Sequence, residues 1–194
     1  LSTTADNIAI GNQAGDALTT GSTNVAIGSD ALGAAQTTTD CVAIGHNALL
    51  LNTANSLVAI GSLALNANTT GIQNLALGYS TLSANQTGNY NLAIGHNALL
   101  LNTVSQNLAI GAGALDACTT GASNVALGVD ALTALGIGSF NMAVGSSLKA
   151  VTSGQNNVAI GQSAAITVTT GVNNIAIGTY SLYQALHWAV TKAG

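Results

Sequence analysis

The sequence predicts an all-β fold, a parallel β-solenoid, because a short motif repeats along it, the motif alternates in the manner of a strand, and charge is scarce. The motif is Asn-φ-Ala-φ-Gly, in which φ is aliphatic, and eleven copies of it or close variants cover nearly the whole chain. Charged residues make up 4% of the 194 residues, against about 25% in ordinary soluble domains. Repeats this short cannot each bury a core, so we expect them to stack.

The motif itself is predicted to be a β-strand. In Asn24 to Gly28, "NVAIG", the residues Val25 and Ile27 alternate with small or polar ones, which is a period of two. β-branched residues suit a pleated surface, whereas Asn and Gly at the ends of every copy would weaken a helix. We expect Val and Ile to point into the core, and Ala and Gly to form a flat outward surface for packing between chains.

The residues around the strand are expected to form ladders along the solenoid. The Asn that opens nine of the eleven copies predicts a ladder of amides that hydrogen-bond the coils above and below. The closing glycines predict a corner shared by every unit. Most units carry a leucine four residues after the glycine, which predicts a second short strand with an inward side chain: Leu32, Leu49, Leu65, Leu82, Leu99, Leu115, Leu132 and Leu182.

A longer period of 50 residues lies over the short one. The closing glycines are spaced 17, 17 and 16 residues apart in succession, and "HNALLLNT" occurs at His46 to Thr53 and again at His96 to Thr103. This leaves two geometries open. With one unit per turn, eleven rungs make a rod of roughly 50 Å and place His46 and His96 about 14 Å apart. With three units per turn, the units form the sides of a prism and the two histidines come within about 5 Å.

These repeats resemble those of known fibre proteins. "NVAIGSDAL" from Asn24 and "TTGASNVALGVDAL" from Thr119 look like repeats of bacteriophage tail fibres and bacterial surface proteins, and are similar in style to the head repeats of trimeric autotransporter adhesins of the YadA type. The resemblance covers about Asn7 to Leu182. It implies a left-handed parallel β-roll, assembled as a homotrimer, that forms the shaft or receptor-contacting head of an extracellular fibre.

The sequence predicts no catalytic, cofactor-binding or metal-binding residues. The six Asp are scattered, and no nucleophile with a base and no phosphate-binding loop stands out. His46 and His96 have no third ligand beside them, so we interpret them as polar residues that follow the corner glycine. Cys41 and Cys118 are 77 residues apart at different phases of the repeat, which predicts two separate buried thiols rather than a disulfide.

Charge and hydropathy exclude two classes of partner. The net charge is −4, with Lys149 and Lys192 as the only basic residues besides histidine, so nucleic acid binding is not expected. Apolar runs such as Ala48 to Leu51 stop well short of the ~18 to 20 residues of a membrane span. The remaining partners are copies of the same chain, and host-surface glycans or receptors.

We divide the chain into a solenoid array over residues 1–178 and a cap or junction over 179–194. The last segment departs from the motif and contains Tyr180, Tyr183 and Trp188, with Leu182, Leu186 and Val190 at helical spacing. We expect a non-enzymatic, self-associating segment of an extracellular fibre, from a virion or a cell surface. One alternative is a subunit that polymerises end to end into a filament. Another is an ice-binding solenoid, suggested by the Thr-rich turns.

Overall fold

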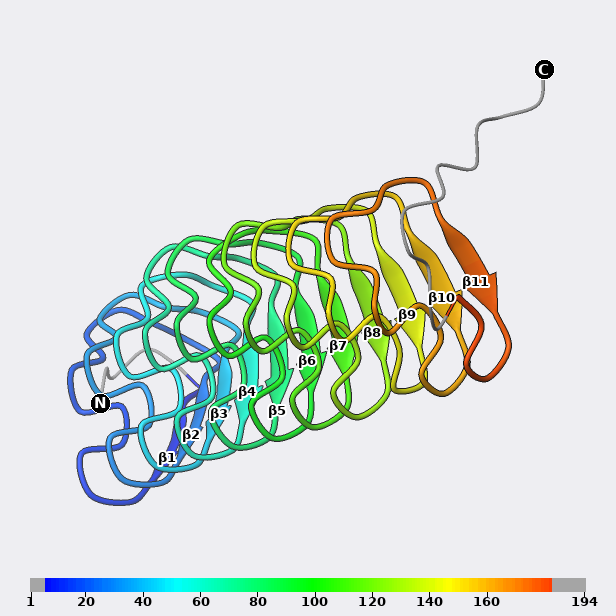
Figure 1. Cartoon of the computed structure of the whole chain (residues 1–194). Coiled ribbons are helices and arrows are strands. Elements are labelled where there is room, and N and C mark those ends of the chain that lie inside the picture. The colour runs from blue at the N-terminus through cyan, green and yellow to red at the C-terminus, as the bar shows by residue number, and fades with distance from the viewer. Residues whose placement is uncertain (1–5, 183–194) are drawn as a thin grey trace.

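A computed structural model describes residues 6–182, and within that range it contains β-strands and turns but no helix. Eleven strands form one parallel sheet in chain order, and the connecting segments complete the wall of a rod (Figure 1). The all-β solenoid fold is therefore confirmed. The strands are β1 (Ile8–Ile10), β2 (Val25–Ile27), β3 (Val42–Ile44), β4 (Val58–Ile60), β5 (Leu75–Leu77), β6 (Leu92–Ile94), β7 (Leu108–Ile110), β8 (Val125–Leu127), β9 (Met142–Val144), β10 (Val158–Ile160) and β11 (Ile175–Ile177).

One repeat unit makes one turn of the solenoid. Each strand pairs in parallel with the strand of the next unit and in the same register, as Ile8 with Val25 and Ala9 with Ala26. The alternative of three units per turn is wrong, because it would pair strands fifty residues apart. We number the turns by the residue that precedes each strand: Asn7, Asn24, Cys41, Leu57, Asn74, Asn91, Asn107, Asn124, Asn141, Asn157 and Asn174 open turns 1 to 11.

The strands face the opposite way from the prediction. The central alanine of β2 to β10 is fully buried, whereas the aliphatic residues on either side of it reach solvent. The cause is the small cross-section of a turn of 16 or 17 residues. The alanines share one core with the leucines of the opposite wall, and a core packed at normal density has room there for a methyl group rather than a branched side chain.

The leucines after the corner point inward, as predicted, except Leu182 in the last turn, which is 38% exposed. They do not belong to a second strand. Leu49 and Leu99 are fully buried with φ of 51° and 52°, in the left-handed region. Most equivalent residues adopt the same conformation, so the chain bends at each leucine. The two residues that follow the leucine point outward together, and the pattern of alternating sides ends there.

The asparagine ladder is confirmed. The Oδ1 atom of Asn124 accepts the backbone N–H of Asn141, one turn later, at 2.9 Å, and its Nδ2 donates to the Gly138 carbonyl at 2.9 Å. Cys41 and Leu57 interrupt this ladder in turns 3 and 4. A second column of buried asparagines runs through turns 3 to 6. Their Nδ2 groups donate to the backbone carbonyl that is equivalent, in each of these turns, to the Gly138 carbonyl of turn 8. These asparagines are Asn52, Asn68, Asn85 and Asn102.

The corner glycines are required by close contact between successive turns. Gly95 has a φ of 133°, and a Cβ atom there would lie 2.5 Å from the carbonyl oxygen of Gly111. Equivalent contacts recur along the rod as far as turn 10. Any other residue would therefore separate two turns as well as strain its own backbone.

The three shorter turns are not equivalent. Turns 3 and 6 lack the second threonine of the Thr-rich corner, so that Thr53 and Thr103 are followed directly by buried or partly buried residues. Turn 9 is instead one residue shorter just after its corner glycine. The Leu132 N–H donates to the carbonyl of Ser147, the second residue after that glycine, whereas in earlier turns the equivalent acceptor is the third residue after the glycine. Gly145 accordingly has a φ of 84°, well below its counterparts. The solenoid thus accommodates a deletion at either corner.

The predicted cap lies mostly outside the described residues. Of the segment 179–194, the structure describes Thr179 to Leu182, and the aromatic residues Tyr183 and Trp188 fall beyond it. The cap therefore stays a prediction.

Candidate functional site

The most distinctive surface of the chain is the outer face of its sheet, which we call the sheet face. Two columns of aliphatic side chains run along it, one from the first and one from the third residue of every strand. None of these residues is buried, and many are more than one-third exposed, including Ile10, Leu77, Ile110 and Ile160. Because the strands are identical in length and register, the columns are continuous and the face is regular.

Aromatic residues border the sheet face on both edges. Tyr90 is the last residue of turn 5 and Phe140 is the last residue of turn 8, so each directly precedes the asparagine that opens the next turn. Both side chains are more than half exposed. On the other edge, the residue after the corner glycine is Tyr79 in turn 5 and His96 in turn 6, and their rings stack with centroids 5.4 Å apart and planes inclined by 12°. The face thus combines an aliphatic centre with aromatic residues at its edges, and aromatic residues are enriched in protein contact surfaces.

The structure does not bring the two histidines together. His46 lies in turn 3 and His96 in turn 6, with Ser62 and Tyr79 at the same position of the two turns between. Three rungs correspond to about 14 Å, too far to share one metal ion. Among residues 6–182, no group of three or more His, Cys or Asp residues is close enough to hold a metal.

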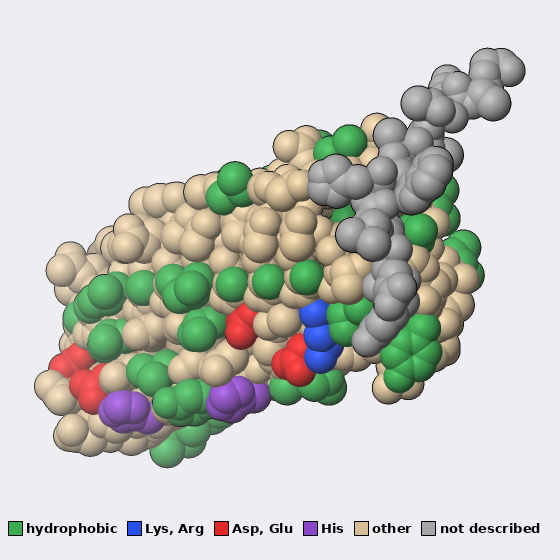
Figure 2. All heavy atoms as spheres, in the orientation of Figure 1, with side chains coloured by type: hydrophobic (Ala, Val, Ile, Leu, Met, Phe, Trp, Pro, Cys, Tyr) green, Lys and Arg blue, Asp and Glu red, His purple; other side chains and the backbone are tan. Residues whose placement is uncertain are grey.

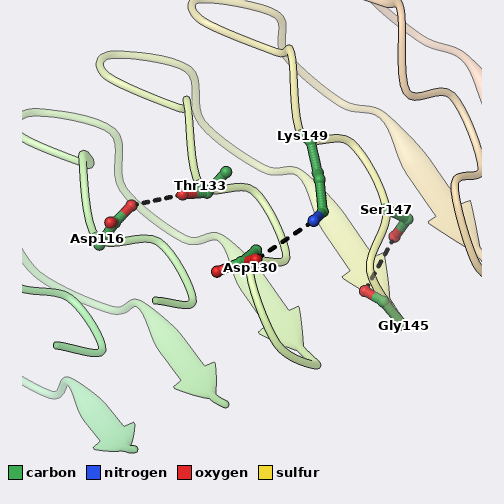
Figure 3. A network of polar contacts seen from close by, with 6 residues as sticks. All are labelled: Asp116, Asp130, Thr133, Gly145, Ser147 and Lys149. Carbon is green, nitrogen blue, oxygen red and sulfur yellow. Dashed lines mark hydrogen bonds and ion pairs between the residues drawn. The ribbon is translucent and has the colours of Figure 1, made fainter. Parts of the chain in front are cut away.

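A small polar network lies near the C-terminal half of the rod (Figure 3). The Lys149 Nζ atom is 3.3 Å from Asp130 Oδ2, and the Thr133 hydroxyl donates to Asp116 Oδ1 at 2.8 Å. Both members of the ion pair are substantially exposed, so the pair contributes at most about 1 kcal/mol. These contacts join side chains of turns 7, 8 and 9.

The two cysteines are separate buried thiols, as expected. Both are free. Burial raises the pKa of Cys118 to about 11 and raises the pKa of Cys41 as well. Since the thiolate is the reactive form, such thiols are poor nucleophiles at neutral pH. Cys41 occupies the place of a ladder asparagine and its thiol contacts the Ala54 carbonyl at 3.4 Å.

Threonines form a further column at the corner opposite the glycines. Their hydroxyls donate to the carbonyl of the next turn, as Thr53 to Thr69 at 2.8 Å and Thr69 to Gln86 at 3.0 Å. The column is more regular than the sequence suggested. It is nevertheless interrupted every third turn, at Gln36, Gln86 and Gly136.

Sequence reasoning identified no binding residues and missed the sheet face, because it assigned the aliphatic residues to the core. The signal was present in the repeats: all eleven central positions are Ala, while the flanking positions vary among Val, Ile, Leu and Met. A tightly confined interior position tolerates one residue, whereas an outer position accepts several.

Comparisons with protein-family models, with curated proteins and with solved structures found no match to this chain. Within residues 6–182 there is no helix able to cross a membrane.

Proposed function

We propose that this chain is a non-enzymatic structural segment of an extracellular fibre, on a virion or a cell surface, and that it assembles with copies of itself through the sheet face. The observation that carries the proposal is the pair of exposed aliphatic columns that runs the length of the sheet. Monomeric soluble proteins rarely leave an apolar patch of more than a few hundred Å² uncovered. A partner that covers this one must be equally long and straight.

A homotrimer satisfies this requirement. The face is about 50 Å long and about 10 Å wide, which gives roughly 500 Å² per chain. Two chains would bury about 1,000 Å² in one contact, at the low end for a specific interface, and three faces that converge on one axis would bury about 1,500 Å² shared among three contacts. In a closed three-fold ring each chain meets two neighbours through different surfaces, and the two columns provide one surface for each.

The fibre proposal extends to adhesion at the rim of the face. Exposed Tyr90 and Phe140 offer flat apolar rings beside the sheet edge, which could stack on sugar rings of a host-surface glycan. An ice-binding role fits less well, because the sheet face carries aliphatic residues and the threonine column is interrupted at Gln36 and Gln86. Purified protein should accordingly give no thermal hysteresis.

The proposal is tested by placing a charge in the sheet face. We expect wild-type protein to sediment as a trimer, and Ile94→Lys, at the last residue of β6 and halfway along the rod, to sediment as a monomer, since a buried unpaired ammonium is strongly unfavourable. Thr87→Lys is the matched control, because it adds the same charge to an exposed residue at the Thr-rich corner. Circular dichroism verifies that both variants fold.

Two outcomes would overturn the proposal: a wild-type protein that is monomeric at all accessible concentrations, or an Ile94→Lys variant that remains trimeric. Negative-stain images of the wild type separate the fibre segment from the alternative filament. Discrete rods support the trimer, whereas long fibres formed by the purified chain would indicate end-to-end polymerisation.

A further inference from the structure

A second apolar surface lies on another side of the rod. In each turn the two residues after the inward leucine position both point outward, and we call these pairs in turns 1 to 9 the lateral strip. Hydrogen bonds between turns hold the strip in register, as from the Ala34 N–H to the Leu50 carbonyl at 3.0 Å and from the Ala84 N–H to the Leu100 carbonyl at 3.1 Å. Figure 2 shows a continuous row of hydrophobic side chains along this face of the rod, with acidic groups near the N-terminal end and, toward the other end, a lysine that has acidic groups beside it.

The lateral strip has a pattern of knobs and gaps. The second residue of each pair is Ala in seven of the nine turns and Leu in turns 3 and 6. Leu51 and Leu101 are 49% and 46% exposed, and they project about 14 Å apart above a row of methyl groups. A flat partner would touch the two leucines and leave the alanines uncovered. A complementary partner must present small residues opposite each leucine.

The same strip on a second copy is such a partner when the two rods run antiparallel with turn 5 opposite turn 5. Leu51 then faces Ala117, Leu101 faces Ala67, and Ala84 lies on the two-fold axis. The charges at the two ends of the strip agree with this register, whereas Asp116 in turn 7 faces Leu50 in turn 3. Asp16 in turn 1 faces Lys149 in turn 9, and the two-fold axis repeats the pair at the other end.

Other antiparallel registers are worse. A slip of one turn in either direction removes both Asp16–Lys149 pairs, and in one direction it also places Leu51 opposite Leu101. A slip of two turns in one direction places Asp16 opposite Asp116, so that like charges meet twice. In the other direction it places Leu101 opposite its own copy. Lys149 remains available in the favoured register, because its side chain is one-third exposed even when paired with Asp130.

We propose that the lateral strip is a second self-association surface, which pairs antiparallel copies of this chain about a two-fold axis at Ala84. The strip spans nine turns, about 43 Å, and with a width of about 10 Å it buries roughly 400 Å² on each chain. This area is below that of a stable dimer, so single chains pair weakly and transiently. Assemblies that already contain several chains bind through several strips at once and gain avidity. The strip thereby bundles fibres side by side, beyond the assembly of any one fibre.

Disulfide trapping tests the register. We expect Ala84→Cys to form a covalent dimer under mild oxidation several-fold faster than Ala67→Cys, because a thiol at position 84 meets its own copy on the axis while a thiol at position 67 would face Leu101. Both substitutions add one thiol to a partly exposed Ala position of the strip, and the native thiols are buried. Equal rates for the two variants, or no dimer from Ala84→Cys, would overturn the proposal.

Charge reversal provides an independent test in the Ala84→Cys background. Asp16→Lys and Lys149→Asp should each slow the cross-linking, and the double variant should restore it, because the charges then attract again. A double variant that is slower than either single variant contradicts the proposed register. Repeating the measurement with Ile94→Lys removes assembly through the sheet face, so that failure of one surface is distinguished from failure of the other.

Discussion

Removal of one ladder asparagine should cost more in turn 8 than in turn 6. Asn124 is fully buried, and in the part of the chain that the structure describes its Nδ2 group is the only side-chain donor to the Gly138 carbonyl. Asn124→Ala therefore leaves two groups without partners, the Gly138 carbonyl and the Asn141 N–H, which bonds to Asn124 Oδ1. Each unsatisfied buried group costs about 1 to 3 kcal/mol, so the free energy of unfolding should fall by about 2 to 6 kcal/mol.

Asn91→Ala is the matched comparison, because a second asparagine compensates for it. The Val104 carbonyl accepts from the Nδ2 groups of both Asn91 and Asn102, each at 2.8 Å. Only the Asn107 N–H loses its partner in this variant, and the expected loss is about 1 to 3 kcal/mol. Both substitutions remove the same atoms, so the difference between the two losses of stability measures the cost of leaving the Gly138 carbonyl without its hydrogen bond.

Urea unfolding of both variants, followed by circular dichroism, measures this difference. We expect Asn124→Ala to be the less stable by about 1 to 3 kcal/mol, with unchanged denaturant dependence of the free energy. Equal destabilisation would refute the reasoning, since it would mean that the second asparagine column does not substitute for the first. Asn12→Ala lies at an exposed position, and its side chain makes a single hydrogen bond of 3.5 Å, to Gln13, among the residues that the structure describes. This substitution should change stability by less than about 0.5 kcal/mol.

Three further predictions concern single sites. Thr38→Val should raise the free energy of unfolding by about 1 kcal/mol in urea titrations, because the buried Thr38 hydroxyl has no hydrogen-bond partner among residues 6–182 and Val104 occupies the same place in turn 6. A loss of stability would contradict this. Gly95→Ala should lower the melting temperature sharply and Gly136→Ala only slightly, since an added Cβ would lie 2.5 Å from a backbone oxygen at Gly95 and 3.7 Å from one at Gly136; similar melting temperatures would count against the proposed crowding. The free energy of unfolding should fall as pH rises from about 8.5, the ordinary pKa of cysteine, to about 11, the pKa of Cys118 in the folded protein, because the thiol of the unfolded chain releases its proton first. Cys118→Ala should weaken this pH dependence, and a pH profile that is the same in the variant as in the wild type would refute the prediction.

The features that could be predicted from the sequence are those that recur at the same position of every repeat unit. The spacing of the corner glycines indicated the strands, the stacking and the shared corner, and Asn124 and its equivalents form the expected ladder. The direction of the side chains could not be read from alternation alone, because a period of two states that neighbours lie on opposite sides without stating which side is inside. Because Val25 and Ile27 are more hydrophobic than Ala26, the sequence favoured them as core residues. In the structure Ala26 is the buried residue, because the narrow interior of the turn has room only for a small side chain.

The fifty-residue period has its clearest expression on the surface. Inside the rod, the alanine column is the same in every turn, and the leucine column is nearly so. The shorter turns also differ in which corner is shortened, so the interior does not require one particular deletion. The exposed leucines of "HNALLLNT", by contrast, recur three turns apart at Leu51 and Leu101. A spacing that the core does not need but the outer surface displays is best explained by contact with a partner of the same period, and another copy of this chain has that period by construction.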